Sequence, residues 1–509
     1  MRLGPAVLVL SLAAGAARAD CGASGLYEGQ ALTDDGTKIE VTLNLYCDRD
    51  RLAAQFFTSS GDFPGSDVTA EGERLTMGFD TRAALGTMEL TRKGEALSGT
   101  FDLAGSKGTA SFARKGPALA SDAMTPRLDL TPKQWHDDLA TFARELPAHH
   151  ANAFFSLSRQ AFDAEVAKLD KRIDTANGDE IFVGLQQIAK SIGDGHTGMV
   201  APRDRRVLPI EIAKFGGEFR IVAAGPGAAQ ALGARIVRIA GMRMADVWPR
   251  VMTLTPQGEL DQLRRADALV YLARGYALHG LDIAPSRDHA VFTLVGDDGQ
   301  SFDLDIAAIP AGADPGLTAL SPERSLRNQN KDAAFWCKDI GDRTVYCGWR
   351  AYQDLALRAK EMLALLDSAK PDKLVIDMRD NGGGDNTVGY AEVLKPLEAR
   401  ADVNRKGHLY VLIGAETFSA AMNNAAQFQD ETKAILVGET IGEKPNSYQE
   451  PRQFRLPNSH LVVRASTLWY AFRKTGPNVV APDREIVPAW DDVKAGRDPV
   501  LDWVLAQKP

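Results

Sequence analysis

Three short apolar segments, each followed by a glycine-containing turn, constrain this chain more than any other feature. They are residues 373–377, 409–413 and 434–437. Short apolar runs bounded by glycine are typical of buried strands, and here they alternate with segments of helical periodicity. This order predicts a parallel α/β sheet, in which the loops after the strands meet at one edge and carry the chemistry.

The loops after these segments carry three polar motifs. They read Asp377-Met-Arg-Asp-Asn-Gly-Gly-Gly384, Thr417-Phe-Ser-Ala-Ala421 and Gly438-Glu-Thr-Ile-Gly-Glu-Lys-Pro-Asn446. We therefore expect a serine, a lysine and a triple-glycine turn at one edge of the sheet. Because no Gly-Lys-Ser/Thr follows the glycines, a phosphate-binding loop is excluded.

The first residues are those of a secretory signal peptide. Arg2 precedes an apolar core, and Ala17-Arg-Ala19 forms a small-x-small cleavage site before Asp20. No later stretch reaches the roughly 18 uncharged apolar residues of a membrane span. We therefore expect a mature chain that begins near Asp20, is exported to the periplasm or secreted, and has no integral membrane segment.

The four cysteines favour disulfides, since an exported chain meets an oxidising compartment. They fall into two local pairs, and Cys21–Cys47 with Cys337–Cys347 is the economical choice among three connectivities. Four buried free thiols are the less favoured alternative. The second pair flanks residues 340–343, which are predicted to form a turn between two short strands.

The N-terminal part alternates apolar and polar residues with a period of two. Ile39, Val41, Leu43 and Leu45 show this pattern, and turn motifs such as Asp34-Asp-Gly36 separate the runs. The pattern predicts an antiparallel β meander or a small barrel. Nothing in this part has the arrangement of a catalytic site.

Three helices are expected next. Thr131 and Gln134 form a capping box at the first, Ser158 caps the second, and the third ends at Gly193. This places His196 on an exposed turn, where it is either a general base, given its ordinary pKa near 6.5, or a helix-capping residue.

The adjacent pair His149 and His150 is interpreted as a surface feature, because no zinc-binding pattern accompanies it. We expect neither a metal nor a cofactor.

Residues 207–308 have the element order of a degenerate PDZ module. Strands at 210–212, 219–222 and 235–239 precede a glycine turn and a helix at 244–251. Such modules add an extended peptide to a sheet edge. Peptide docking and simple packing are equally weighted here, because no clear carboxylate-binding glycine loop is present.

At 509 residues the chain is too long for one core, and its composition is that of a globular protein. The net charge of −8 argues against nucleic acid as a partner. The predicted organisation is a signal peptide at 1–19, an all-β domain at 20–115, a linker at 116–130, a helical segment at 131–200 that packs on the last domain, a PDZ-like module at 201–309, a linker at 310–332 and an α/β domain at 333–509.

The three loop motifs and their order resemble the S41 family of serine peptidases, also called tail-specific or C-terminal processing proteases. The matching positions are Asp377, Arg379, Asn381, Gly383 and Gly384, then Thr417 to Ala421, then Gly438 to Asn446. Asp194-Gly-His196-Thr197 and Pro482-Asp483 resemble the branch of tricorn protease and the retinoid-binding repeats. The resemblance covers residues 130–509 and implies a ClpP/crotonase-like α/β catalytic domain.

The residues themselves support this chemistry. Ser419 precedes a helical pattern, so its hydroxyl is expected at a helix N-terminus, where it is either a nucleophile or an ordinary N-cap. The resemblance implies that the amides of Gly383 and Ala420 form the oxyanion hole. A tight turn is the alternative role for these glycines. Asp377 and Arg379 are expected to brace the turn rather than touch substrate.

The general base has two candidates. Lys444 stands where the family places the lysine of a serine/lysine dyad, and a lysine can serve only if burial brings its pKa down from about 10.4 to near neutrality. His196 matches the base of the tricorn-like branch. That branch also has a glutamate shortly before its Pro-Asp pair, but residues 475–483 of this chain contain no carboxylate before Asp483. We therefore rank Lys444 first and His196 as the competing or auxiliary base.

The sequence thus predicts an exported serine peptidase that cleaves unfolded or C-terminal segments of polypeptides. The alternative is a catalytically inactive protein of the same fold that binds peptides or small hydrophobic ligands. An α/β-hydrolase is disfavoured, because Ser419 lacks the Gly-x-Ser-x-Gly pattern. The oligomeric state is left open.

Overall fold

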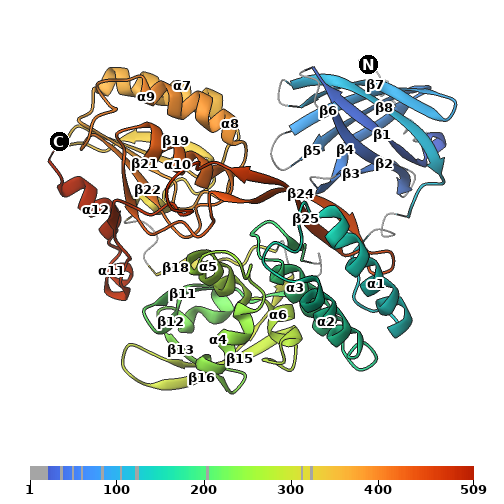
Figure 1. The fold of residues 1–509 in the computed structure, drawn as a ribbon, viewed down its shortest axis with the longest axis horizontal. Coiled ribbons are helices and arrows are strands. Elements are labelled where there is room, and N and C mark those ends of the chain that lie inside the picture. The colour runs from blue at the N-terminus through green and yellow to red at the C-terminus, as the bar shows by residue number, and fades with distance from the viewer. Residues whose placement is uncertain are drawn as a thin grey trace, which may run out of the picture. The chain divides into compact units, whose positions relative to one another are not determined.

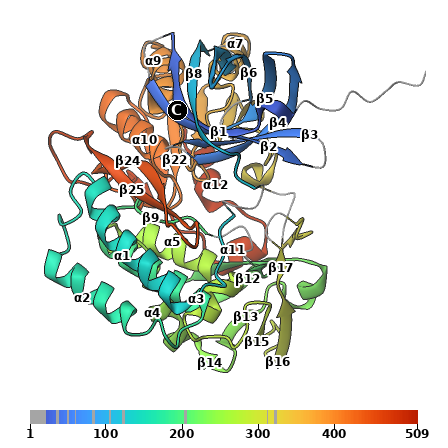
Figure 2. The same ribbon diagram turned by 90° about the vertical axis from the view of Figure 1, so that its right-hand side faces the viewer.

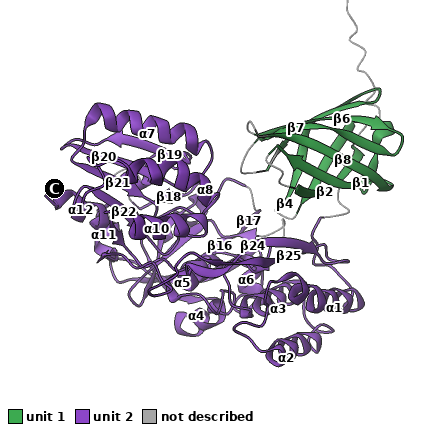
Figure 3. Ribbon diagram, turned by 45° about the horizontal axis from the view of Figure 1, so that its top comes forward, with its two compact units in different colours: residues 1–124 green, residues 125–509 purple. Residues whose placement is uncertain are grey.

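The computed structural model divides the chain into two compact units, residues 1–124 and 125–509 (Figure 3). The predicted signal peptide, residues 1–19, lies outside the described part. The residues described are 21–34, 38–48, 51–58, 61–81, 85–103, 106–120, 125–201, 206–310, 313–320 and 325–508.

The first unit is a closed antiparallel barrel, so the barrel form of the prediction is confirmed. Strand β1 pairs with both β2 and β8, which leaves no open edge. Alternate residues such as Leu43 and Leu45 are fully buried, and phenylalanines fill the interior. The strands are β1 Gly25–Thr33, β2 Lys38–Asp48, β3 Arg51–Thr58, β4 Gly61–Glu71, β5 Arg74–Asp80, β6 Leu85–Lys93, β7 Ala96–Leu103 and β8 Ser106–Gly116.

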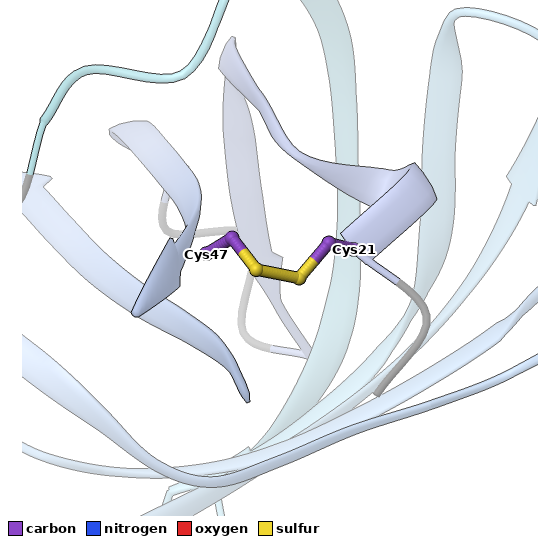
Figure 4. Close-up of a disulfide and its surroundings, with 2 residues drawn as sticks. All are labelled: Cys21 and Cys47. Carbon is purple, nitrogen blue, oxygen red and sulfur yellow. A yellow bond between two sulfur atoms is a disulfide. The ribbon is translucent and has the colours of Figure 1, made fainter. Parts of the chain in front are cut away.

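Both expected disulfides are present. Cys21 joins Cys47 of β2 with a Cα–Cα distance of 5.7 Å (Figure 4). Cys337 joins Cys347 with a Cα–Cα distance of 4.1 Å, and the two residues lie directly opposite each other on β19 (Phe335–Asp339) and β20 (Thr344–Trp349). The turn predicted between these strands is confirmed.

The second unit begins with the three predicted helices, α1 (Pro132–His149), α2 (Arg159–Asp170) and α3 (Gly178–Ser191). The Thr131–Gln134 capping box and the Ser158 cap are both present. Helices α1 and α3 lie beside a three-stranded sheet of β9 (Gly198–Met199), β24 (Asn446–Arg455) and β25 (Val462–Ala471), as Figures 1 and 2 show. This sheet links the segment after α3 to the C-terminal part.

A seven-stranded antiparallel sheet and a separate pair of strands follow, and the strands and the helix expected for residues 207–308 are present. Its PDZ-like character stays a prediction. The elements are β10 Arg206–Val207, β11 Ile210–Phe215, β12 Glu218–Ala224, β13 Arg235–Ile239, β14 Met242–Arg243, α4 Met244–Met252, α5 Asp261–Tyr271, α6 Gly275–Gly280, β15 His289–Val295, β16 Ser301–Ala307, β17 Ile309–Pro310 and β18 Thr318–Ala319.

The C-terminal part is the predicted α/β sheet, in the order β19-β20-β21-β22-β23-β26 and parallel from β20 onward. Strands β21 (Lys373–Asp377), β22 (Leu409–Ile413) and β23 (Ile435–Gly438) fall where the apolar runs placed them. One face packs on α7, α9 and α10, and the other on α12. The remaining elements are α7 Leu355–Ala369, α8 Asn386–Gly389, α9 Lys395–Glu398, α10 Ala420–Glu431, β26 Arg484–Glu485, α11 Trp490–Lys494 and α12 Pro499–Ala506.

Within the described ranges, none of the helices has the length and apolar character needed to cross a membrane.

Candidate active site

Ser419 stands between β22 and α10 with an unusual backbone conformation. Its φ of 55° and ψ of −125° lie in a region that residues other than glycine rarely adopt. Although it is the residue before the helix, its side chain makes no capping hydrogen bond. The hydroxyl is therefore directed to another partner.

That partner is His196. Its Nε2 lies 3.2 Å from the Ser419 Oγ, within hydrogen-bonding distance. The turn that carries His196 is shaped by Asp194, whose Oδ1 accepts the backbone amides of His196 and Thr197 at 3.1 and 2.8 Å. The structure thus brings together two residues that are 223 positions apart in the sequence.

His196 is not on an exposed turn, so that expectation is wrong. Only 10% of its side chain is exposed, because β9 pairs with β25 directly after the turn and the ring stacks on Phe418 at a centroid distance of 4.6 Å. Burial lowers the pKa of His196 to about 4. The nearby Asp194 opposes this shift, and Lys190 adds to it. At neutral pH the imidazole is uncharged and can accept a proton.

His150 is also buried, contrary to the interpretation of the histidine pair as a surface feature; its neighbour His149 is exposed. The Nε2 of His150 lies 2.9 Å from Asp194 Oδ2, and Ser466 donates to the other oxygen. These bonds outweigh burial and hold the pKa of Asp194 at about 2. Asp194 is thereby fixed as a carboxylate beneath the His196 turn.

Glu443 is a site residue that the sequence interpretation missed. Its Oε1 lies 3.5 Å from His196 Nδ1, and its Oε2 accepts the backbone amide of Ser419. The side chain is completely buried, and burial, together with the neighbouring Glu259, raises its pKa well above the ordinary value. A carboxyl group therefore faces the imidazole, although it comes from the loop after β23 rather than from residues 475–483.

Lys444 points away from this arrangement. Its ammonium group donates to the carbonyl oxygen of Gly258, and its backbone amide donates to Glu259 Oε2 at 3.1 Å. The structure does not bring the lysine side chain to Ser419. Its contacts instead join the loop after β23 to the segment between α4 and α5.

The triple-glycine turn lies directly against the serine. A Cβ atom on Gly383 would stand 2.7 Å from the Ser419 Cβ, and Gly383 has a φ of +103°. The amide of Gly383 donates to Asn381 Oδ1 at 3.0 Å. Ala420 begins α10, where backbone amides have no partner within the helix. The Ala420 amide can therefore receive an anion without disrupting the helix.

A buried ion network braces this turn, as expected for Asp377 and Arg379. The guanidinium of Arg379 bonds Asp377 at 2.6 Å and Asp498 at 2.7 Å, and Tyr346 donates to Asp377 at 2.7 Å. The network fixes the end of β21 beneath the glycines. Neither Asp377 nor Arg379 contacts Ser419 or His196 through any interaction found in the described chain.

The comparisons with known proteins concern the family and the fold of this chain. Residues 385–486 match the model of Peptidase family S41. Carboxyl-terminal-processing peptidase 1, chloroplastic, of Arabidopsis thaliana is 21% identical over 335 residues, which are 61% of this chain and 63% of that relative. This chain thus spans less than two thirds of the relative's length.

Among the solved structures that resemble this chain, mature CPAF shows the same fold. Mature CPAF complexed with lactacystin has a TM-score of 0.52 at 11% identity, and the match covers 73% of this chain and 97% of that one. The photosystem II D1 C-terminal processing protease gives a TM-score of 0.34 at 14% identity, over 70% of this chain and 94% of that one. At such identities the CPAF likeness concerns the fold alone. The match to the model of Peptidase family S41 covers residues 385–486, the part of the chain that contains Ser419 and Glu443, and together with the ordered motifs it supports the assignment of this chain to that family.

Proposed function

We propose that this protein is a serine peptidase with Ser419 as nucleophile, His196 as general base and Glu443 as the carboxylate that orients the base. The observation that carries the proposal is the hydroxyl of Ser419, which forgoes the helix cap and lies 3.2 Å from an uncharged imidazole. This geometry favours His196 over Lys444 as the base, since the lysine ammonium is directed to Gly258.

In the proposed reaction, Ser419 Oγ attacks the peptide carbonyl carbon while His196 Nε2 takes the hydroxyl proton. The resulting imidazolium faces Glu443 Oε1, which stabilises its charge. His196 then gives the proton to the leaving amine, and a water molecule activated by the same nitrogen hydrolyses the acyl-enzyme. The Ala420 amide stabilises the oxyanion. The amide of Gly383 becomes the second donor to the oxyanion when it gives up its hydrogen bond to Asn381 Oδ1.

We propose extended polypeptide as the substrate, cut near its carboxyl terminus. The name of the Arabidopsis relative supports this class. The antiparallel sheet at 206–310 offers a second support, because the PDZ-like order of its strands suits the addition of a peptide strand. Export to an oxidising compartment is also a proposal, supported by the two disulfides.

The test is the cleavage of a permanently unfolded polypeptide, reduced and carboxymethylated lysozyme, by the wild type and by Ser419→Ala. We expect the variant to lose activity by about 10³- to 10⁴-fold or more, since the nucleophile is removed. Equal cleavage by both proteins would contradict the proposal. Binding of the polypeptide without cleavage by the wild type would favour the inactive-binder alternative.

A further inference from the structure

The segment between α4 and α5 passes between the two loops that carry the proposed catalytic residues. On one side, the amide of Gln257 donates to the Lys190 carbonyl and that of Gly258 to the Gly193 carbonyl, each at 3.0 Å. On the other side, the amide of Leu260 donates to the Gly442 carbonyl at 3.2 Å. Residues 257–260, which we name the bridging segment, thus bond to the chain before His196 and to the chain before Glu443.

The side chain of Glu259 completes this bridge. Its Oε1 accepts the amide of Gly195 at 3.2 Å, and its Oε2 accepts the amide of Lys444 at 3.1 Å. Gly195 directly precedes His196, and Lys444 directly follows Glu443. The side chain of Glu259 therefore bonds the residue next to His196 and the residue next to Glu443, the two residues whose side chains must meet.

Close packing fixes the position of the bridging segment. A Cβ atom on Gly258 would stand 2.8 Å from the Gly193 oxygen, and one on Gly442 would stand 2.1 Å from the backbone nitrogen of Leu263. The backbones touch with no side chain between them. Since Glu259 is only 8% exposed, its burial is costly unless both oxygens are bonded.

The charged groups around Glu259 act in opposite directions. Burial raises its pKa to about 7, Lys444 lowers it, and Asp194 raises it. The buried carboxyl of Glu443 lies on the same loop as Lys444, and the ammonium of Lys190 donates to the Gly195 carbonyl at 3.3 Å. The ionised form of Glu259 accepts the hydrogen bonds from the amides of Gly195 and Lys444 more strongly than the protonated form does.

We propose that Glu259 is a positioning residue that holds His196 and Glu443 in register with Ser419 by binding the loops of both. The inference rests on the proposed function and extends it. The contacts in question are 3.2 and 3.5 Å long, so a small shift of either loop breaks them. A displacement of about 1 Å costs on the order of 100-fold in rate.

The test compares Glu259→Gln and Glu259→Ala with a matched control, Glu180→Gln. Gln has the length of Glu but only one acceptor oxygen for the two amides. Glu180 also accepts a backbone amide, that of Asn177, but it does so in the capping box of α3. The measurement is kcat and KM for cleavage of the unfolded polypeptide, with kcat referred to the folded fraction from near-UV circular dichroism.

We expect kcat to fall by about 10- to 100-fold in Glu259→Gln and further in Glu259→Ala, with KM within about twofold, because the loops lose register while substrate binding is untouched. Glu180→Gln keeps the wild-type kcat. A wild-type kcat in Glu259→Gln, or a change confined to KM, would overturn the inference. Ser419→Ala is assayed alongside: if it stays active the proposed function fails, whereas an inactive Ser419→Ala beside a fully active Glu259→Gln refutes only the role of Glu259.

Discussion

Ser419 has a backbone conformation that costs on the order of 1–3 kcal/mol for a residue with a side chain. Two contacts hold it there: its amide donates to Glu443, and Gly383 packs against its Cβ. The conformation turns the hydroxyl away from the helix N-terminus and toward His196. The strained conformation therefore leaves the hydroxyl free of the helix cap, as the proposed role of Ser419 as nucleophile requires.

The pH dependence of cleavage follows from two shifted groups. Because burial lowers the pKa of His196 to about 4, the imidazole is an uncharged base at every pH above that value. Burial raises the pKa of Glu443, so this group keeps its proton to a higher pH than an ordinary glutamate does. It is a carboxylate only when the pH exceeds this raised pKa. We expect kcat/KM to fall on acidification with a midpoint set by the buried carboxyl groups rather than by histidine.

The measurement is the pH–rate profile of the wild type beside that of Glu443→Gln. The variant is expected to be slower and to lose the inflection that Glu443 contributes, so that the remaining losses of activity come from Glu259, whose pKa is about 7, and from His196 near pH 4. A profile that keeps the wild-type midpoint in Glu443→Gln would show that another group controls the acid limb.

Individual site residues differed in how well the sequence revealed them. Ser419 and His196 stand in ordered motifs, and the folded chain brings them within 3.2 Å of each other. Glu443 lies inside a recognised motif but was overlooked beside Lys444, because the direction of each side chain depends on how the loop packs. Glu259 was unpredictable, since it lies 64 positions from Gly195 and 185 from Lys444, and it bonds the backbone amides of these residues rather than their side chains.

At the scale of elements, the site is built where parallel strands end. The loops after β21, β22 and β23 supply the glycine turn, Ser419 and Glu443, while His196 and Glu259 come from outside this sheet. Continuous apolar runs predicted all three strands, and the uninterrupted burial of β21 and β22 shows why such strands carry no alternation. The β9–β25 pairing that carries His196 into the site joins residues far apart in sequence, and no local pattern predicts it.

Gly383→Ala tests how tightly two of these loops meet. The added methyl group would stand 2.7 Å from the Ser419 Cβ, and alanine is strained at a φ of +103°. We expect a loss of about 1–3 kcal/mol in the free energy of unfolding and a fall in kcat of about 100-fold or more. Chemical denaturation and steady-state kinetics measure the two effects.

The matched control is Gly382→Ala. A methyl group there meets no atom within 4 Å, and the residue is not among the glycines with positive φ. This variant should keep wild-type stability and activity. If the two variants changed stability and kcat equally, the contact between Gly383 and Ser419 would have no special role.

At the scale of the whole molecule, each unit has its own core and its own disulfide. The barrel of unit 1 buries a separate hydrophobic cluster, and all of the proposed catalytic residues belong to unit 2. Within unit 2, the site forms only when the turn after α3, the bridging segment and the loops of the α/β sheet come together. Helix and strand patterns predicted the turn after α3 and the loops of the α/β sheet, but not the bridging segment or the contacts between these parts, which arise from tertiary packing.

The most direct test of this account compares His196→Gln with Lys444→Met in cleavage of the unfolded polypeptide. Each change removes a candidate base while keeping most of the side-chain volume. We predict that His196→Gln lowers kcat by about 10²- to 10⁴-fold, whereas Lys444→Met loses one bond to Gly258 and lowers kcat by less than about tenfold. An inactive Lys444→Met beside a fully active His196→Gln would contradict the account.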